Sequence, residues 1–383
     1  MFPIKPNKSI VINLIKWTNL FRSIKTGRTT TLTIPQTQTQ PQLSPHQQHQ
    51  SLEIEQLMDR TLLKINGRHV DEYLQSLITN DLSYIQKSIG SLYTMFLNDH
   101  GRLITDGILY KTSESNSYLL DIDMPAIGIV QQHLNKYTKS NSSIQITNYG
   151  SKLNVWQIFS SDALRIRNEA DMIKTNVNCA KRKWLNNDLQ DLVMVYSDPR
   201  SPQLGLRIIA SNDIDFNQII QKLNIKRRHN LTTYKQLRYK LGIAEGVQEL
   251  PPNKSSPLES NGDYLNGIHF NKGRYLGGDI TISLYLNGFI HYRMTPVIFD
   301  GASKVDELNF DDPIIIEHTK KQMIVGKLRG TYDKYGIALL RTDYINRDDM
   351  VVKNVKVKAP KPDWWPVMLT NEMPEQLWAT ALR

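Results

Sequence analysis

The sequence predicts an α+β protein that contains more than one lobe and ends in a β-rich part. Three observations support this fold class. With 383 residues, the chain is long enough for two or three modest domains with substantial cores. Between residues 53 and 280, strand-like and helix-like patterns alternate and are joined by hairpin turns, which favours α+β over a doubly wound parallel sheet. Beyond residue 280 the pattern becomes mostly strands, as expected of a small barrel or sandwich.

The first 52 residues form a basic leader. They contain six lysines and arginines and no acidic residue, and Glu53 is the first carboxylate of the chain. An amphipathic, arginine-containing and acid-free N-terminus is typical of a mitochondrial transit peptide, with a disordered basic tail as the alternative. Its apolar run, residues 10–15, is too short to span a bilayer, and no transmembrane segment is expected after it. Residues 35–50 are rich in Gln and Pro, which predicts a linker.

Hydrophobic spacing predicts the elements of the first lobe. Apolar residues at helical intervals indicate a helix with one buried face, and the β-rich runs around it indicate strands. In order, we expect a strand, a turn around Gly67 and a helix with Val70, Leu74, Leu77 and Ile78 buried (within 61–85), two strands joined at Asn98–Gly101 (within 90–112), a strand at 117–123 and a helix at 125–137.

The same patterns continue through the rest of the chain. The next expected elements are strands at 152–159 and 203–210 and a helix at 216–223, followed by the strand-rich stretches 279–299, 314–341 and 350–360. Asn287–Gly288 and Asp333–Gly336 predict turns between strands of the barrel or sandwich.

Charge gives little support to a nucleic-acid-binding protein. The formal charge is +10, but without the six cations of the leader 41 basic residues remain against 37 acidic ones, a charge of only +4. Residues 222–240 contain seven lysines and arginines and two tyrosines. Contact with nucleic acid is one interpretation of this stretch, and a solvated helix face is the favoured one.

The single cysteine, Cys179, excludes several kinds of site. A disulfide framework within the chain, a cysteine-ligated zinc site and a cluster held by this chain's own cysteines all need more thiols. Cations at 181–183 favour a thiolate, but the polar surroundings indicate a connecting segment and an ordinary thiol. The histidines show no H-E-x-x-H spacing, so no metal site is predicted.

The glycine-rich stretch NKGRYLGGDITISL, residues 271–284, contains no nucleophile. Gly273 and Gly278 have the separation of a P-loop, but Asp279 stands where a lysine is required, and its carboxylate would repel a phosphate. Neither G-x-G-x-x-G after a strand nor G-x-S-x-G occurs, so a Rossmann site and a hydrolase elbow lack support.

Residues 241–281 resemble the signature of the folate-binding relatives of the glycine-cleavage T-protein. They are most similar to the branch formed by mitochondrial iron–sulfur assembly factors and their bacterial YgfZ counterparts, which carries K-G-C-Y-x-G-Q-E-x-T preceded by P-x-E-x-N. The resemblance extends in order over nearly all of 60–360, including 74–81, 93–110 and 326–341. The matching residues are Pro257, Glu259 and Asn261 in the prelude and Lys272, Gly273, Tyr275, Gly277 and Thr281 in the signature.

The signature also departs from the family pattern. Arg274 occupies the cysteine position, Gly278 the glutamine position and Asp279 the glutamate position. A mechanism that needs a thiolate here is therefore excluded, because a guanidinium supplies a permanent charge and five donors but neither nucleophilicity nor redox chemistry. The hypothesis is a retained binding loop with altered activity.

The resemblance implies two mixed α/β lobes around a central channel, followed by a C-terminal β-barrel. The implied divisions are 1–52 (presequence and linker), 53–150 (first lobe), 151–279 (second lobe, ending in the signature loop), 280–366 (barrel) and 367–383 (tail).

The resemblance further implies a tetrahydrofolate-like ligand in the channel. Asp106 matches an acidic position that faces the pterin, and Lys272 with the loop amides is expected to attract an anionic group. Each candidate has a structural alternative: Asp106 as a strand terminus, Asn80 and Asp81 as helix caps, Tyr275 as core. The folate-pocket candidates are Asp106, Asn80, Asp81, Glu259 and Asn261, and no catalytic residue is assigned.

Two function classes follow from the resemblance. The first is an assembly factor of the mitochondrial matrix that helps A-type scaffold partners mature 4Fe–4S clusters on aconitase-like and radical-SAM client enzymes, as a monomer or in a transient hetero-complex. The second is a tetrahydrofolate-dependent aminomethyltransferase, which would need an acid/base geometry around the folate. A divergent paralogue with reduced activity is a third possibility. The leader and the K-G-x-Y-x-G stretch favour assembly.

Overall fold

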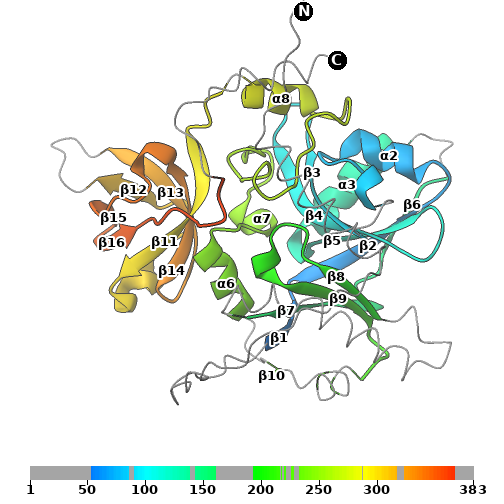
Figure 1. The fold of residues 1–383 in the computed structure, drawn as a ribbon, viewed down its shortest axis with the longest axis horizontal. Helices are drawn as coiled ribbons and strands as arrows, with labels where there is room; N and C mark the ends of the chain where they lie inside the picture. The colour runs from blue at the N-terminus through cyan, green and yellow to red at the C-terminus, as the bar shows by residue number, and fades with distance from the viewer. Residues whose placement is uncertain are drawn as a thin grey trace, which may run out of the picture. The chain divides into compact units, whose positions relative to one another are not determined.

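The computed structural model shows two antiparallel-rich sheets, connecting helices and a closed barrel (Figure 1). The residues it describes are 53–85, 90–138, 143–160, 193–215, 217, 220, 226–227, 233–286, 288–316 and 323–366. The leader, Cys179, the tail from 367 and most of the helix expected at 216–223 lie outside these residues.

The first sheet confirms the strands and helices predicted for 61–137. Alternate residues of its strands face opposite sides: Leu63, Ile65 and Phe96 pack under α2 (Val70–Leu77) and α3 (Ile127–Tyr137), whereas Leu62 and Tyr93 belong to a core shared with the second sheet. Because both faces are covered, β3 and β5 are buried along their whole length. The antiparallel order is β3 (Ser91–Leu97), β4 (Leu103–Lys111), β5 (Ser117–Asp123), β2 (Arg60–Asn66) and β6 (Gln145–Asn148).

The second sheet includes a strand from the start of the described chain. Its order is β10 (Lys226–Arg227), β1 (Glu53–Gln56), β7 (Leu153–Phe159), β9 (Leu206–Ser211) and β8 (Val193–Ser197). The sequence division places 53–56 in the first lobe, but β1 pairs antiparallel with β7, with Glu53 opposite Phe159. A four-residue strand carries too little local pattern to reveal a partner a hundred residues away, so only the pairing assigns it to this sheet.

Helix α6 (Thr233–Leu241) connects the sheets to the barrel. Tyr234, Leu237, Arg238 and Tyr239 of this helix are buried, and the helix contacts β11, β13 and β14. The interpretation of 222–240 as a solvated helix face is therefore wrong for α6. Its cation Arg238 is neutralised by a bidentate pair with Glu249 of α7 (Gly246–Glu249), at 2.8 and 3.0 Å, which allows the charge to be buried.

The C-terminal part is a closed six-stranded barrel, as predicted. Its core is formed by inward-facing residues such as Val297, Ile314 and Leu328, and β16 returns to pair with β11 so that no edge remains in the ring. The strand order is β11 (Tyr292–Asp300), β14 (Tyr335–Arg341), β13 (Ile324–Tyr332), β12 (Pro313–Ile316), β15 (Met350–Val352) and β16 (Val355–Lys358).

Residues 279–286 form a helix, which corrects the strand predicted there. Helix α8 (Gly278–Leu286) begins directly after Gly277, whose φ of 73° lies in the left-handed region. The β-branched residues of TISLYL favour a strand locally, but this segment does not pair with any described strand, and Asp279 in the first turn suits a helix N-terminus. None of the described helices is both long and apolar enough to cross a membrane.

Candidate functional site

The signature loop is anchored by Lys272 to the end of helix α2. The Lys272 ammonium donates to the backbone carbonyls of Gln75 and Ile78, at 2.7 and 2.5 Å, where the last turn of α2 leaves carbonyls without helical partners. It also lies 4.9 Å from the centre of the Tyr275 ring. Burial lowers the pKa of Lys272 to about 7, against the opposing effect of Asp81. This lysine is therefore directed at the protein's own backbone.

Gly277 and Gly278 allow close approach between parts of the chain itself. A Cβ on Gly277 would lie 2.4 Å from the carbonyl oxygen of Asn98, in the turn between β3 and β4, and one on Gly278 would lie 2.8 Å from the Tyr275 ring. Tyr275 is buried, and its burial raises its pKa to about 12. The geometry therefore supports the alternative that Tyr275 is a core residue.

The position of the family's cysteine lies on the surface. Arg274 is exposed, as are its neighbour Gly273 and, at the start of α8, Asp279. Gly273 has a φ of 90° and no atom within 4 Å of a Cβ placed on it, so the backbone there is open to solvent. Thr281 is buried in α8. The loop thus holds one arginine outward between two fixed flanks.

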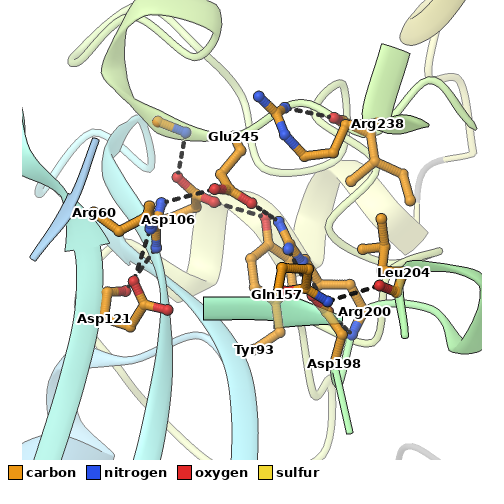
Figure 2. Close-up of polar contacts among 12 residues, drawn as sticks. Arg60, Tyr93, Asp106, Asp121, Gln157, Asp198, Arg200, Leu204, Arg238 and Glu245 are labelled. Carbon is orange, nitrogen blue, oxygen red and sulfur yellow. Dashed lines mark hydrogen bonds and ion pairs between the residues drawn. The ribbon is translucent and has the colours of Figure 1, made fainter. Parts of the chain in front are cut away.

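A network of buried charges joins the first sheet, the second sheet and α7. Figure 2 shows part of it, including Arg60, Asp121 and Glu245. Asp121 on β5 accepts from Arg60 on β2 and from Arg207 on β9, both at 2.7 Å. Glu245, just before α7, accepts from Arg207 at 3.0 Å and also from Arg200. Each of these side chains is at most 5 % exposed, so the charges are removed from water and depend on one another.

The charge states of the network follow from its pairing. Burial works against ionisation of Glu245, but the guanidinium groups of Arg200, Arg60 and Arg207 outweigh it and hold the pKa of Glu245 well below its ordinary value. Arg200 also pairs with Asp198 at 2.7 Å and donates to the Tyr234 hydroxyl at 2.8 Å. Glu245 is therefore ionised near neutral pH.

Asp106 lies at the edge of this network and not in an open channel. Its Oδ1 accepts from the backbone N–H of Gly246 at 3.0 Å, and its Oδ2 accepts from the Tyr93 hydroxyl at 3.4 Å (Figure 2). Burial raises the pKa of Asp106, an effect that Arg60 opposes and Glu245 reinforces. The residue is 1 % exposed. Its carboxylate connects β4 to the start of α7.

These residues do not fit a folate at Asp106. Recognition of a pterin needs a carboxylate facing a space for the ring, whereas both oxygens of Asp106 bond to the chain and the neighbouring arginines are paired. A cavity of about 130 Å³ lies nearby, lined by residues 55–59 and by Tyr234, Lys235, Arg238 and Glu245. Sites for drug-sized ligands typically measure roughly 300–1,000 Å³. This cavity is lined by neither Asp106 nor the signature loop.

Asn80 and Asp81 stabilise the turn after α2. The Asn80 amide donates to the carbonyls of Tyr93 at 2.8 Å and Asn266 at 2.6 Å. Asp81 accepts from the backbone N–H of Ser83 at 3.0 Å. Burial works against ionisation, but hydrogen bonds from Ser83 and Gln75 lower the pKa of the Asp81 carboxyl. The pair thus connects the turn to β3 and to the segment that precedes the signature loop.

Glu259 and Asn261 connect the prelude to the barrel. Asn261 has a φ of 60°, is fully buried, and donates to the carbonyl of Met294 on β11 at 2.7 Å. The Glu259 carbonyl accepts from the Met294 N–H at 2.8 Å. Burial raises the pKa of the Glu259 carboxyl, and Arg102 and Arg329 oppose this. The prelude residues Glu259 and Asn261 therefore connect the segment after α7 to strand β11 of the barrel.

The structure brings together only some of the predicted site residues. Lys272, Tyr275, Asn80 and Asp81 cluster around the end of α2, whereas Asp106 belongs to the buried network and Glu259 and Asn261 contact β11. The described residues contain no group of three or more His, Cys, Asp or Glu side chains arranged to hold a metal ion. Sequence patterns missed the network, although Arg207 inside the apolar run QLGLRIIA is a local indication of a buried charge.

Comparison with known proteins gives two close similarities in sequence. The chain is 29% identical over 323 residues to the mitochondrial iron–sulfur cluster assembly factor IBA57 of Mus musculus, covering 80% of this chain and 84% of that protein. The human protein of the same name is 28% identical, with 81% and 84% covered. Residues 292–367 match the family described as CAF17, C-terminal beta-barrel domain.

The chain is similar over about four fifths of its length to the IBA57 iron–sulfur cluster assembly factors.

A solved structure shares the fold of this chain. The glycine cleavage system aminomethyltransferase T of Bartonella henselae superimposes with a TM-score of 0.60, covering 82% of this chain and 86% of that one. At 11% identity the likeness concerns the fold alone. The predicted T-protein-like architecture and the family resemblance are confirmed. The relatives are named as mitochondrial, and the chain is a mitochondrial protein, as its leader predicts.

Substitution of Gly277 by alanine is expected to destabilise this protein far more than substitution of Gly273. Both glycines have positive φ, which costs an alanine about 1–2 kcal/mol. Only at Gly277 would the new Cβ also collide with a backbone carbonyl, adding roughly 1–3 kcal/mol. The free energy of unfolding of Gly277→Ala and Gly273→Ala, measured in urea, tests this. Equal losses for both variants would contradict the close contact with the Asn98 turn.

Lys272 is expected to make stability rise with pH above neutrality. Its pKa is about 7 in the folded chain, below the ordinary 10.5, so between these values the unfolded chain binds more protons. The free energy of unfolding of the wild type should therefore increase, relative to Lys272→Met, from pH 7 to pH 9. Exposed Lys254→Met serves as the control, measured by the same urea titrations. A decrease would mean that the two carbonyl bonds outweigh burial and raise the pKa.

Proposed function

We propose that this chain is an assembly factor of the mitochondrial matrix that supports maturation of 4Fe–4S proteins. The names of its relatives support the assembly role and the location. Client enzymes of the aconitase and radical-SAM type, and A-type scaffold proteins as partners, are the finer part of the proposal. The aminomethyltransferase alternative has no described acid/base arrangement in its favour.

The observation that carries this proposal is the outward position of Arg274 between fixed flanks. Lys272 attaches one side of the loop to α2, and Gly277 attaches the other side to the β3–β4 turn. A loop that is rigid on both sides and exposed at its centre is suited to contact with another protein. The guanidinium offers a permanent, planar donor to carboxylates of a partner.

The same position excludes a role as a cluster ligand. Iron in such clusters is held by thiolates, with imidazole as the usual replacement, and an arginine provides neither. In this proposal the partner's own ligands hold the cluster, and this chain contributes binding and orientation. The third possibility is a divergent paralogue with reduced activity. Such a paralogue is expected to rescue a depleted cell less well than the assembly factor that we propose.

Complementation of depleted cells tests the proposal. After depletion, the activities of mitochondrial 4Fe–4S enzymes such as aconitase should fall while 2Fe–2S proteins are spared. The unmodified chain should restore them, and Arg274→Glu should restore them less, with charge reversal of the exposed Arg68, before the opposite end of α2, to Glu as the matched control. Loss of both cluster types alike would argue against a specific 4Fe–4S role. Rescue by Arg274→Cys alone would show that the arginine leaves the loop inactive.

The proposal includes no folate-dependent step. Binding of tetrahydrofolate to the purified chain tests this part of the proposal. We expect no saturable binding of tetrahydrofolate by isothermal titration calorimetry, because Asp106 is already bonded to Gly246 and Tyr93. Asp106→Asn should leave the titration unchanged. Binding in the micromolar range that is lost in Asp106→Asn would restore the folate prediction and require the buried network to open.

A further inference from the structure

A small cavity lies between the connection from β1 to β2 and helix α6. Its volume is about 130 Å³. An apolar cavity of roughly 150 Å³ holds benzene, so this volume suits a molecule of about six non-hydrogen atoms. The lining contains three carboxylates and two cations, which are Glu55, Asp59, Glu245, Lys235 and Arg238. The cavity therefore has the size and the polarity of a site for a small charged molecule.

The buried part of the lining contains a donor that the described chain leaves unpaired. Arg238 is 4 % exposed, and its two terminal nitrogens bond to the Glu249 carboxylate and to the carbonyl of Ile243. Its Nε has no hydrogen-bond partner among the described residues. Buried donors are normally paired, because leaving one unpaired is costly, and their partner is often a ligand or an ordered water. Since Arg238 lines the cavity, the cavity is the place that offers room for this partner.

Charges of both signs occur at the buried and at the exposed parts of the lining. Glu55 and Glu245 are buried with Arg238, and Glu55 accepts from the backbone N–H of Tyr234 at 3.1 Å. Towards solvent, Asp59 is exposed and Lys235 is half-buried. The Lys235 ammonium lies 5.3 Å from the centre of the Tyr239 ring, a contact that leaves its N–H donors available.

This charge pattern selects one class of ligand. A simple anion would approach three carboxylates, and a simple cation would approach two basic side chains and leave the Arg238 Nε unpaired. A molecule with both a carboxylate and an ammonium group can pair with both signs. An α-amino acid with a small side chain, such as alanine, combines these two groups within the available volume.

We propose that the cavity between the β1–β2 connection and α6 binds a small zwitterionic amino acid. Its carboxylate is directed toward the Arg238 Nε and Lys235, and its ammonium group toward the carboxylates of the lining. The site goes beyond the proposed assembly function, because the signature loop does not line it. Since the lining comes from both the β1–β2 connection and α6, the bound amino acid stabilises the contact between the second sheet and this helix.

Titration of the full chain with three molecules of similar shape tests the charge pattern. By isothermal titration calorimetry, alanine should bind, whereas propionate, which lacks the ammonium group, and ethylamine, which lacks the carboxylate, should bind about tenfold more weakly or less. Equal affinity for either of these two molecules would overturn the assignment of a zwitterion. No saturable alanine binding up to about 50 mM would mean that only water fills the cavity, which would also overturn the proposal.

Substitutions at the exposed edge of the cavity locate the binding. Met58 lines the cavity and is 55 % exposed, so the larger side chain of Met58→Trp should occupy the space and abolish alanine binding. Met323→Trp on the barrel, where Met323 is 39 % exposed, is the matched control and should bind alanine as the wild type does.

A second pair of variants tests the contact with the carboxylate. Lys235→Met should weaken alanine binding about tenfold, and exposed Lys254→Met, which does not line the cavity, should leave it unchanged. Circular dichroism establishes that each variant is folded. Wild-type affinity in Met58→Trp or in Lys235→Met would place the alanine elsewhere and contradict the proposal.

Discussion

The contacts between the two sheets depend on the buried network around Asp121 and Glu245. Two arginines from different sheets share the Asp121 carboxylate, and Glu245 brings the start of α7 to the same group. Such charges are costly to remove from water, so each is tolerated only because its partners are in place. Loss of one partner in a buried pair typically costs about 3–5 kcal/mol, because a charge is then left uncompensated. The network therefore makes the relative position of sheets and α7 specific.

The same network gives Asp106 a structural role in place of the predicted role in a ligand pocket. In a T-protein-like fold the space between the lobes is the natural place for a ligand, since sites often form between domains. Here the arginines, carboxylates and tyrosines of the chain itself occupy the surroundings of Asp106, and its oxygens bond to Gly246 and Tyr93. The fold is shared with the T-protein, but the oxygens of Asp106 bond to the chain itself. Function therefore depends on the site more than on the architecture.

The signature loop shows a similar separation of scaffold and chemistry. Lys272 and Gly277 hold the loop against α2 and the β3–β4 turn, and these are structural tasks that survive the replacement of the cysteine by Arg274. Gly277 and Gly278 in 271–284 allow close packing within the chain, whereas Gly273 takes a left-handed backbone conformation in an open position. What the loop presents to other molecules is a single exposed cation beside an apolar helix.

The sequence by itself determined the elements whose pattern is local. The strand, turn and helix around Gly67, the hairpin at Asn98–Gly101 and the barrel strands were predictable because periodicity, turn residues and alternation act within about ten residues. The family resemblance also followed from motifs in order along the chain. Tertiary structure alone decided that β1 joins the second sheet, that 278–286 is a helix, that α6 is buried, and that Asp106 is enclosed by arginines. Those features depend on partners 60 to 180 residues apart, and burial and charge pairing at such separations leave almost no trace in local composition.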